Sequence, residues 1–101
     1  MIVVHVEAQI DLAKEEQARA AALVMQEATR AEPGNLAYRF SQAVDDPAAV
    51  LVFEAWKDQP AIDAHGASTH MADFGTVLGQ VLAGPVTVTQ YEVKDSTTFT
   101  M

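Results

Sequence analysis

The sequence predicts an α+β fold in which helices cover one face of an antiparallel sheet. Strand-like and helix-like patterns follow one another along the 101 residues in the order β-α-β-β-α-β. No repeat, linker or low-complexity segment divides the chain, so residues 1–101 are expected to form one domain. This order is that of the ferredoxin-like, or split βαβ, arrangement.

The first part of the chain is expected to form a strand and a long helix. In residues 2–10, IVVHVEAQI, apolar residues occupy every second position, as in a strand with one apolar face. Asp11 is a good N-cap for the Ala-rich segment 12–32, which has a helical stripe of small and apolar residues. Pro33-Gly34 is expected to end this helix.

The middle of the chain is expected to form a hairpin, residues 35–44 and 50–57, around the turn DDPAA. Its second strand is apolar on both faces, because Leu51 and Phe53 lie opposite the face that carries Trp56. An antiparallel strand that is half solvated should instead alternate with polar residues. The sequence therefore predicts that a second copy covers the bare face, giving a C₂ homodimer with two sheets face to face.

Two more helices and a strand are expected in the remainder. DQPAIDAHG has the composition of a short helix, and a longer amphipathic helix is expected to begin at Ser68 or Thr69 and to end at Gly84-Pro85. The β-branched segment 86–93 is expected to be the last strand. The polar tail, residues 94–101, is expected to form either a short extra strand or a frayed end.

Composition excludes several classes of partner. With 6 basic and 14 acidic residues the net charge is −8, which disfavours nucleic acid and anionic membrane surfaces as partners. The absence of cysteine excludes disulfides and thiolate catalysis and fits a reducing compartment. The N-terminal MIVVHVEAQID lacks the basic region of a signal peptide, so a cytoplasmic location is predicted.

The stretch from Pro33 to Phe74 contains PGNLAYRF and DDPAAVLVFEAWKDQPAIDAHGASTHMADF. It resembles the antibiotic biosynthesis monooxygenase (ABM) family in its Pro-Gly, its Asp-Pro turn, its Glu-x-Trp at a strand end, its Ala-His and a second histidine near the next helix start. The resemblance implies a dimeric α+β barrel. It also implies a monooxygenase that oxidises a small aromatic phenol, quinol or anthrone with O₂, without metal, flavin or other cofactor.

Oxygenation without a cofactor sets three chemical requirements. Triplet O₂ reacts poorly with closed-shell molecules, but a deprotonated phenol is electron-rich enough to give it one electron. The protein must therefore supply a dry aromatic pocket, a proton acceptor and donors that steady the anion. His65 or His70 is the candidate base, and Glu54 is the candidate carboxylate that orients it, with a pKa that burial would raise.

The other candidate residues are aromatic. Trp56 could stack on a planar substrate or could be a large core residue. Tyr38 could donate a hydrogen bond, and Phe40 and Phe74 could line the pocket or pack only in the core. No metal site is expected, because an i,i+5 histidine pair with Gly66 between its members is unlike the i,i+4 pair of zinc sites.

Two alternative functions stay open. Haem-degrading relatives on the same fold use a strand-one Asn, a strand-three Trp and a helix His; Trp56 and His65 are present, but the first strand offers Ala8 or Gln9 where that Asn is needed. A non-catalytic dimeric module that binds a small ligand is the second alternative, and no residue excludes it.

Overall fold

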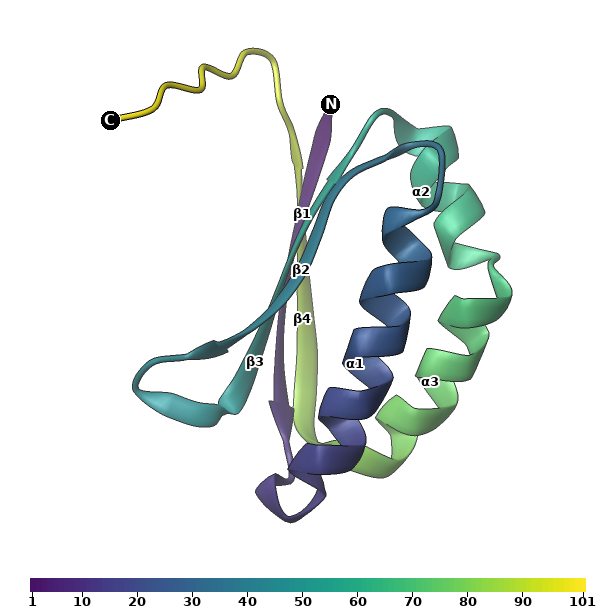
Figure 1. Cartoon of the computed structure of the whole chain (residues 1–101), viewed down its shortest axis with the longest axis vertical. Helices are drawn as coiled ribbons and strands as arrows, with labels where there is room; N and C mark the ends of the chain where they lie inside the picture. Colours follow the sequence, from purple (N-terminus) through teal and green to yellow (C-terminus); the bar gives the residue numbers. More distant parts are fainter.

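A computed structural model describes all residues from Met1 to Met101. It contains one four-stranded antiparallel sheet, and all helices lie on one side of it (Figure 1). In chain order the elements are β1 (Ile2–Ile10), the 3₁₀ turn η1 (Leu12–Lys14), α1 (Glu15–Arg30), β2 (Asn35–Ala43), β3 (Asp46–Trp56), α2 (Gln59–Gly66), α3 (Thr69–Val81) and β4 (Leu82–Glu92). None of the helices is both long and apolar enough to cross a membrane.

The strand order is β2-β3-β1-β4, so the two central strands are the first and third of the chain. β1 pairs antiparallel with both β3 and β4, and Val4 lies opposite Glu54 on one side and Gln90 on the other. The predicted ferredoxin-like α+β class is therefore confirmed. The end of β3, paired with the start of β2, leads directly into α2 at this end of the sheet (Figure 1).

The core lies between the sheet and the helices. Five buried side chains form it, and Trp56 at the end of β3 has no exposed surface at all; the five are Val4, Met25, Tyr38, Val52 and Trp56. Their strand members alternate with residues of the opposite face, as the sequence pattern predicts. This packing fixes the positions of the polar groups at the carboxyl end of β3.

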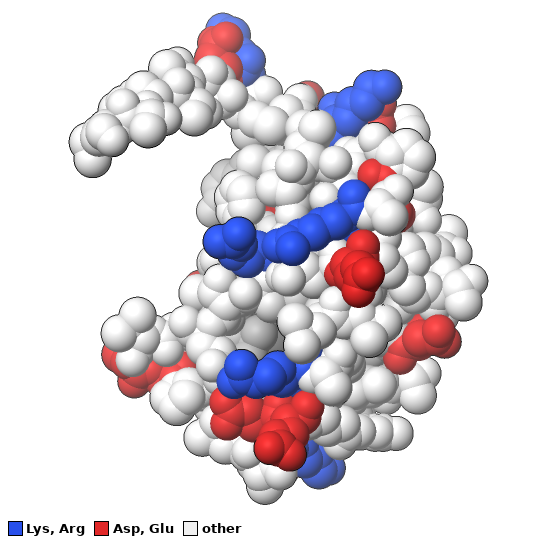
Figure 2. Space-filling model, viewed as in Figure 1, with Lys and Arg blue, Asp and Glu red and all other residues white.

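The opposite face of the sheet carries no helix (Figure 1). Phe53 is 48% exposed at its centre, and a hollow of about 620 Å³ lies there, with Leu36 and Arg39 among its lining residues. The β2–β3 turn and the C-terminal tail both project on this side, so the molecule is concave there (Figures 1 and 2). The tail, residues 94–101, forms no strand.

The hairpin turn differs from the prediction. β3 already begins at Asp46, and the turn consists of Val44 and Asp45 rather than of the Asp-Pro segment. Pro47 is tolerated inside a central strand because β1 pairs with β3 only as far as Ala49, so no ladder bond needs its missing N–H.

The end of the last helix was also predicted wrongly. α3 stops at Val81, and Leu82 starts β4, so Gly84-Pro85 lies in a strand. A Cβ on Gly84 would lie 3.2 Å from the Gln9 side chain, beside the register shift of β1. The glycine therefore permits a close approach of two strands, and the proline is tolerated because β4 is an edge strand.

Candidate functional site

A tight bend between α2 and α3 positions the two histidines of this region. Ser68 is the N-cap of α3: its Oγ accepts from Met71 N–H and donates to the backbone carbonyl of His65. His65 lies in the last turn of α2 and His70 in the first turn of α3. Because the chain bends between them, the two rings face each other with centroids 5.9 Å apart, which i,i+5 spacing within one helix would not allow.

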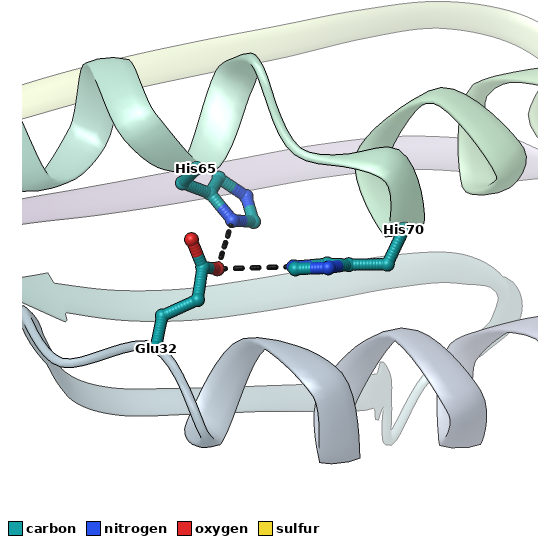
Figure 3. A group of neighbouring side chains, drawn as sticks. All are labelled: Glu32, His65 and His70. Carbon is teal, nitrogen blue, oxygen red and sulfur yellow. Dashed lines mark hydrogen bonds and ion pairs between the residues drawn. The ribbon is translucent and has the colours of Figure 1, made fainter.

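Both imidazoles meet one carboxylate oxygen. Glu32 Oε2 lies 2.7 Å from His65 Nδ1 and 3.1 Å from His70 Nε2. Figure 3 shows the three side chains pointing toward one another from α2, α3 and the segment after α1. A carboxylate only accepts, so both rings donate to it. In a neutral ring the second nitrogen, His65 Nε2 or His70 Nδ1, then has a free lone pair. Neither of these second nitrogens has a protein hydrogen-bond partner.

Glu32 was not among the residues predicted for the site. One physical signal was available: it follows the C-terminal end of α1, where the partial negative charge of the helix disfavours a carboxylate. A glutamate that persists there needs cationic or donor partners from elsewhere in the fold. The sequence does not identify those partners, because His65 and His70 follow more than 30 residues later.

Glu54 and Trp56 form the buried floor of the site. The Trp56 indole N–H donates to Glu54 Oε1 at 2.9 Å, so this donor is already used within the protein. Burial raises the pKa of Glu54; the indole hydrogen bond and the nearby His65 oppose this effect, and the charge of Glu32 adds to it. Trp56 also lies against His65, with ring centroids 4.7 Å apart.

Tyr38 is buried, and its hydroxyl lies close enough to Glu54 and Glu32 to feel the charges of both. Its backbone carbonyl accepts from Arg30 Nε at 2.8 Å, which holds β2 against the end of α1, whereas its hydroxyl makes no hydrogen bond to the protein. Burial raises the pKa of this phenol, and the charges of Glu54 and Glu32 raise it further. Tyr38 therefore stays protonated and has a donor available for a ligand.

The predicted aromatic residues form one continuous row. Ring centroids are 5.6 Å apart for Phe74 and Phe40, 5.5 Å for Phe40 and Tyr38, and 5.7 Å for Tyr38 and His65. The structure thus brings all the residues that the sequence singled out into one region: Tyr38, Phe40, Glu54, Trp56, His65, His70 and Phe74. These residues are separated along the chain but lie close together, because β2, β3 and the α2–α3 bend meet at one end of the sheet.

Comparison with known proteins agrees with this architecture. The profile of the family described as antibiotic biosynthesis monooxygenase matches residues 1–76. The chain belongs to the antibiotic biosynthesis monooxygenase family. The match ends before β4, whose pairing with β1 completes the family member's sheet.

Solved structures share the ABM fold over nearly the whole chain. Rv0793 from Mycobacterium tuberculosis is 26% identical, with a TM-score of 0.88 over 96% of this chain and 98% of that one. An ABM family protein from Nitrosomonas europaea is also 26% identical, with a TM-score of 0.88 over 94% of this chain and 100% of that one.

Two curated relatives differ in length. YcnE of Bacillus subtilis strain 168, a candidate monooxygenase, is 26% identical over 94% of this chain and 100% of its own length. Sll1783 of Synechocystis is 28% identical over 71% of this chain but only 49% of its own length, so the chain spans about half of that protein.

A cavity of about 210 Å³ lies between α1 and the β2 edge of this ABM fold. Phe40 lines it together with Gln26, whose side-chain carbonyl accepts from Phe40 N–H at 3.0 Å. Phe40 therefore contacts both this cavity and the aromatic row that leads to His65.

Proposed function

We propose that this ABM family member is a monooxygenase that oxidises a small phenol, quinol or anthrone with O₂ and needs no cofactor for the reaction. The observation that carries this proposal is the carboxylate of Glu32 held by His65 and His70, next to the unpartnered hydroxyl of Tyr38. Such an arrangement offers a base and a donor to one phenolic oxygen, which is what cofactor-free oxygenation requires.

The proton step follows from the tautomers that Glu32 imposes. Each imidazole donates to the carboxylate, so His65 Nε2 or His70 Nδ1 accepts the phenolic proton. The negative charge of Glu32 then stabilises the imidazolium that forms, and Tyr38 donates to the phenolate oxygen. The phenolate gives one electron to O₂, and the resulting substrate radical and superoxide combine into a peroxide on a ring carbon that bears hydrogen. Loss of that hydrogen as a proton, with cleavage of the O–O bond, leaves one oxygen atom on the carbon as a carbonyl, and the other leaves as hydroxide and is protonated to water.

The aromatic row supports binding of a planar ring. Phe74 contacts Phe40, and Phe40 contacts Tyr38; stacking on such rings favours flat aromatic substrates. Trp56 serves as the rigid wall behind His65, with its N–H engaged by Glu54. Glu54 is proposed to orient the site through Trp56 and the charge of His65, because it lies too deep to meet a substrate directly.

The working unit is proposed to be a homodimer of one domain, residues 1–101. The exposed Phe53 and the concave bare face of the sheet support the pairing of two sheets. The tail also extends on that side and carries Phe99, 80% exposed, which a second copy would cover. Two sheets packed in this way would form the α+β barrel that the resemblance implies. A cytoplasmic location stays a prediction.

The test is oxygen uptake by purified, metal-free protein across a panel of quinols and anthrones. We expect turnover that falls by about 10²-fold or more in His70→Ala, the loss typical of a removed general base. Glu27→Gln is the control, because Glu27 is an exposed residue of α1, outside both the site and the bare face of the sheet. Uptake equal in both variants would contradict the role of His70.

The same preparation separates the alternative functions. No oxygen uptake together with a haemin Soret shift would replace the proposal with haem binding. No uptake and no haem binding, with saturable binding of an aromatic ligand, would replace it with a non-catalytic binding module.

A further inference from the structure

Three potential metal ligands converge at the α2–α3 bend. The ligand atoms of Glu32, His65 and His70 all lie within 4.8 Å of one another, although they come from three separate segments (Figure 3). The two histidines are fixed by the Ser68 cap, and Glu32 is held at the turn that ends α1. The cluster is therefore built by the fold and does not arise from neighbouring surface residues.

We propose that Glu32, His65 and His70 bind one divalent transition ion of the zinc class. Two imidazole nitrogens and one carboxylate oxygen are the donor set that borderline ions such as Zn²⁺, Co²⁺ and Fe²⁺ accept. Three protein ligands leave a further coordination position for water or another small molecule.

The distances need little change. Tetrahedral bonds of about 2.0–2.2 Å place neighbouring ligand atoms roughly 3.3 Å apart. The two measured separations from Glu32 Oε2, 2.7 and 3.1 Å, are hydrogen-bond distances. Binding would lengthen these two separations by a few tenths of an ångström and would bring the two histidine nitrogens, which lie within 4.8 Å of each other, to a similar spacing. Each neutral ring would then carry its proton on its other nitrogen, His65 Nε2 or His70 Nδ1.

Charge and access also favour a cation. Glu32 follows the carbonyl end of α1, and the buried Glu54 adds a second carboxylate close enough to interact with His65. The first turn of α3, which holds His70, opposes a cation through its free N–H groups, but the chain as a whole carries a net charge of −8. The His70 side chain is 23% exposed, which gives an ion an entry path.

The site has a regulatory consequence that rests on the proposed function. An ion bound to His65 Nδ1 and His70 Nε2 leaves the proton of each neutral ring on the other nitrogen, so neither ring keeps a lone pair for the phenolic proton. Metal binding should therefore inhibit a reaction that uses these histidines as the base. The binding itself needs no assumption about the reaction.

Binding is measured with tag-free, EDTA-treated full-length protein. We expect Zn²⁺ titration in a calorimeter to give one site per chain in the micromolar range or tighter, and Co²⁺ to give visible absorption bands of nitrogen and oxygen ligation. Glu32→Gln and His70→Ala should each weaken Zn²⁺ binding at least about tenfold, because even residues behind a ligand contribute that much.

Matched controls test whether the cluster is responsible. His5→Ala removes the histidine on the other sheet face, and Glu27→Gln removes an exposed carboxylate of α1; both should bind Zn²⁺ like the wild type. Circular dichroism of each variant verifies folding, and the partly exposed His70 is the safer ligand to remove than the buried His65. Absent saturable binding, or binding that survives both ligand substitutions, overturns the site.

Oxygen uptake distinguishes failure of the metal site from failure of the proposed function. Metal-free turnover that Zn²⁺ inhibits in the wild type supports both. Metal-free turnover without Zn²⁺ binding overturns the metal site alone. Zn²⁺ binding without metal-free turnover supports the metal site and overturns the cofactor-free reaction. If Fe²⁺ then restores oxygen uptake, the three ligands hold a metal that takes part in the reaction with O₂.

Discussion

The two faces of the sheet differ in how far their large side chains are buried. On the helix side, Trp56 and Met25 have 0% and 1% of their surface exposed, whereas on the bare side Phe53 and Tyr91 are 48% and 53% exposed. Phe53 and Trp56 belong to the same strand, and only the pleat separates their faces. The fold therefore buries the apolar side chains of one face within the chain and leaves those of the other face partly exposed.

The polar groups follow the same division. Glu54, His65 and Thr29 are the buried polar residues, and none of them lies on the bare face. The candidate site is consequently assembled within one chain, between sheet and helices. A second copy would close the bare face without supplying any of the site residues described above.

The largest expected effect is a loss of stability in Trp56→Ala. Removing a fully buried indole leaves a cavity and takes away the donor of Glu54, so the free energy of unfolding should fall by about 3–5 kcal/mol. Phe53→Ala should cost only about 1 kcal/mol under conditions in which both proteins are monomeric, because half of that ring is already exposed. Urea unfolding followed by circular dichroism measures both; equal losses would erase the contrast between the faces.

The second prediction concerns association. Phe53→Asp places a charge at the centre of the proposed sheet-to-sheet interface, and we expect sedimentation at micromolar concentration to change from dimer to monomer. The control is Leu12→Asp, because Leu12 is 46% exposed in η1, outside the strands of the sheet. A wild-type monomer, or a Phe53→Asp variant that stays a folded dimer, would show that this face has no partner copy.

The contrast between faces was largely predictable from sequence, because it depends on local alternation and capping. The apolar periodicity identified β1 with its observed bounds, and Asp58 and Ser68 cap α2 and α3 through side-chain oxygens. Gly84-Pro85 was wrongly predicted to end the last helix, because the end of a helix and a close approach of two strands favour the same residues. In that case tertiary pairing with β1 overrode the local signal.

The site was predictable only in part. The Glu-x-Trp and the two histidines lie within one short stretch, so sequence alone brought Glu54, Trp56, His65 and His70 together. Glu32 joins them through a contact across more than 30 residues, which no local pattern encodes. Gly66 indicated a helix break between the two histidines, but the spacing alone did not show that the bend at Ser68 turns them toward each other.

A smaller effect is expected from Glu54→Gln on the covered face. Burial raises the pKa of Glu54 above its ordinary value of 4.5, so folding disfavours the carboxylate relative to the unfolded chain. The raised pKa therefore contributes stability in full below pH 4.5, where Glu54 is protonated in both states. This stability is lost as the pH rises through the pKa of the folded protein. Glu54→Gln, which keeps an acceptor for Trp56, should therefore be more stable than the wild type at pH 7, and the advantage should vanish toward pH 4.

Thermal unfolding of the variant and the wild type at several pH values gives this difference, in which the titration of all other groups cancels. Glu92→Gln, an exposed carboxylate on the edge strand β4, is the control and should show little difference at any pH. A Glu54→Gln protein less stable than the wild type at pH 7 would mean that the ionised carboxylate holds the floor of the site together.

The smallest expected effect concerns a buried hydroxyl on the covered face that has no hydrogen-bond partner. Thr29 has no exposed surface, and its hydroxyl has no hydrogen-bond partner in the protein. A buried unsatisfied hydroxyl costs about 1–3 kcal/mol, so Thr29→Val, which keeps the shape, should leave the free energy of unfolding unchanged or raise it by up to about 1 kcal/mol. Thr29→Ser, which keeps the hydroxyl and loses the methyl group, should lower it. If Thr29→Val is instead the more damaging variant in urea unfolding, the hydroxyl has a bound partner. Since Thr29 lies one helical turn before Glu32, that partner would belong to the site and not to the core.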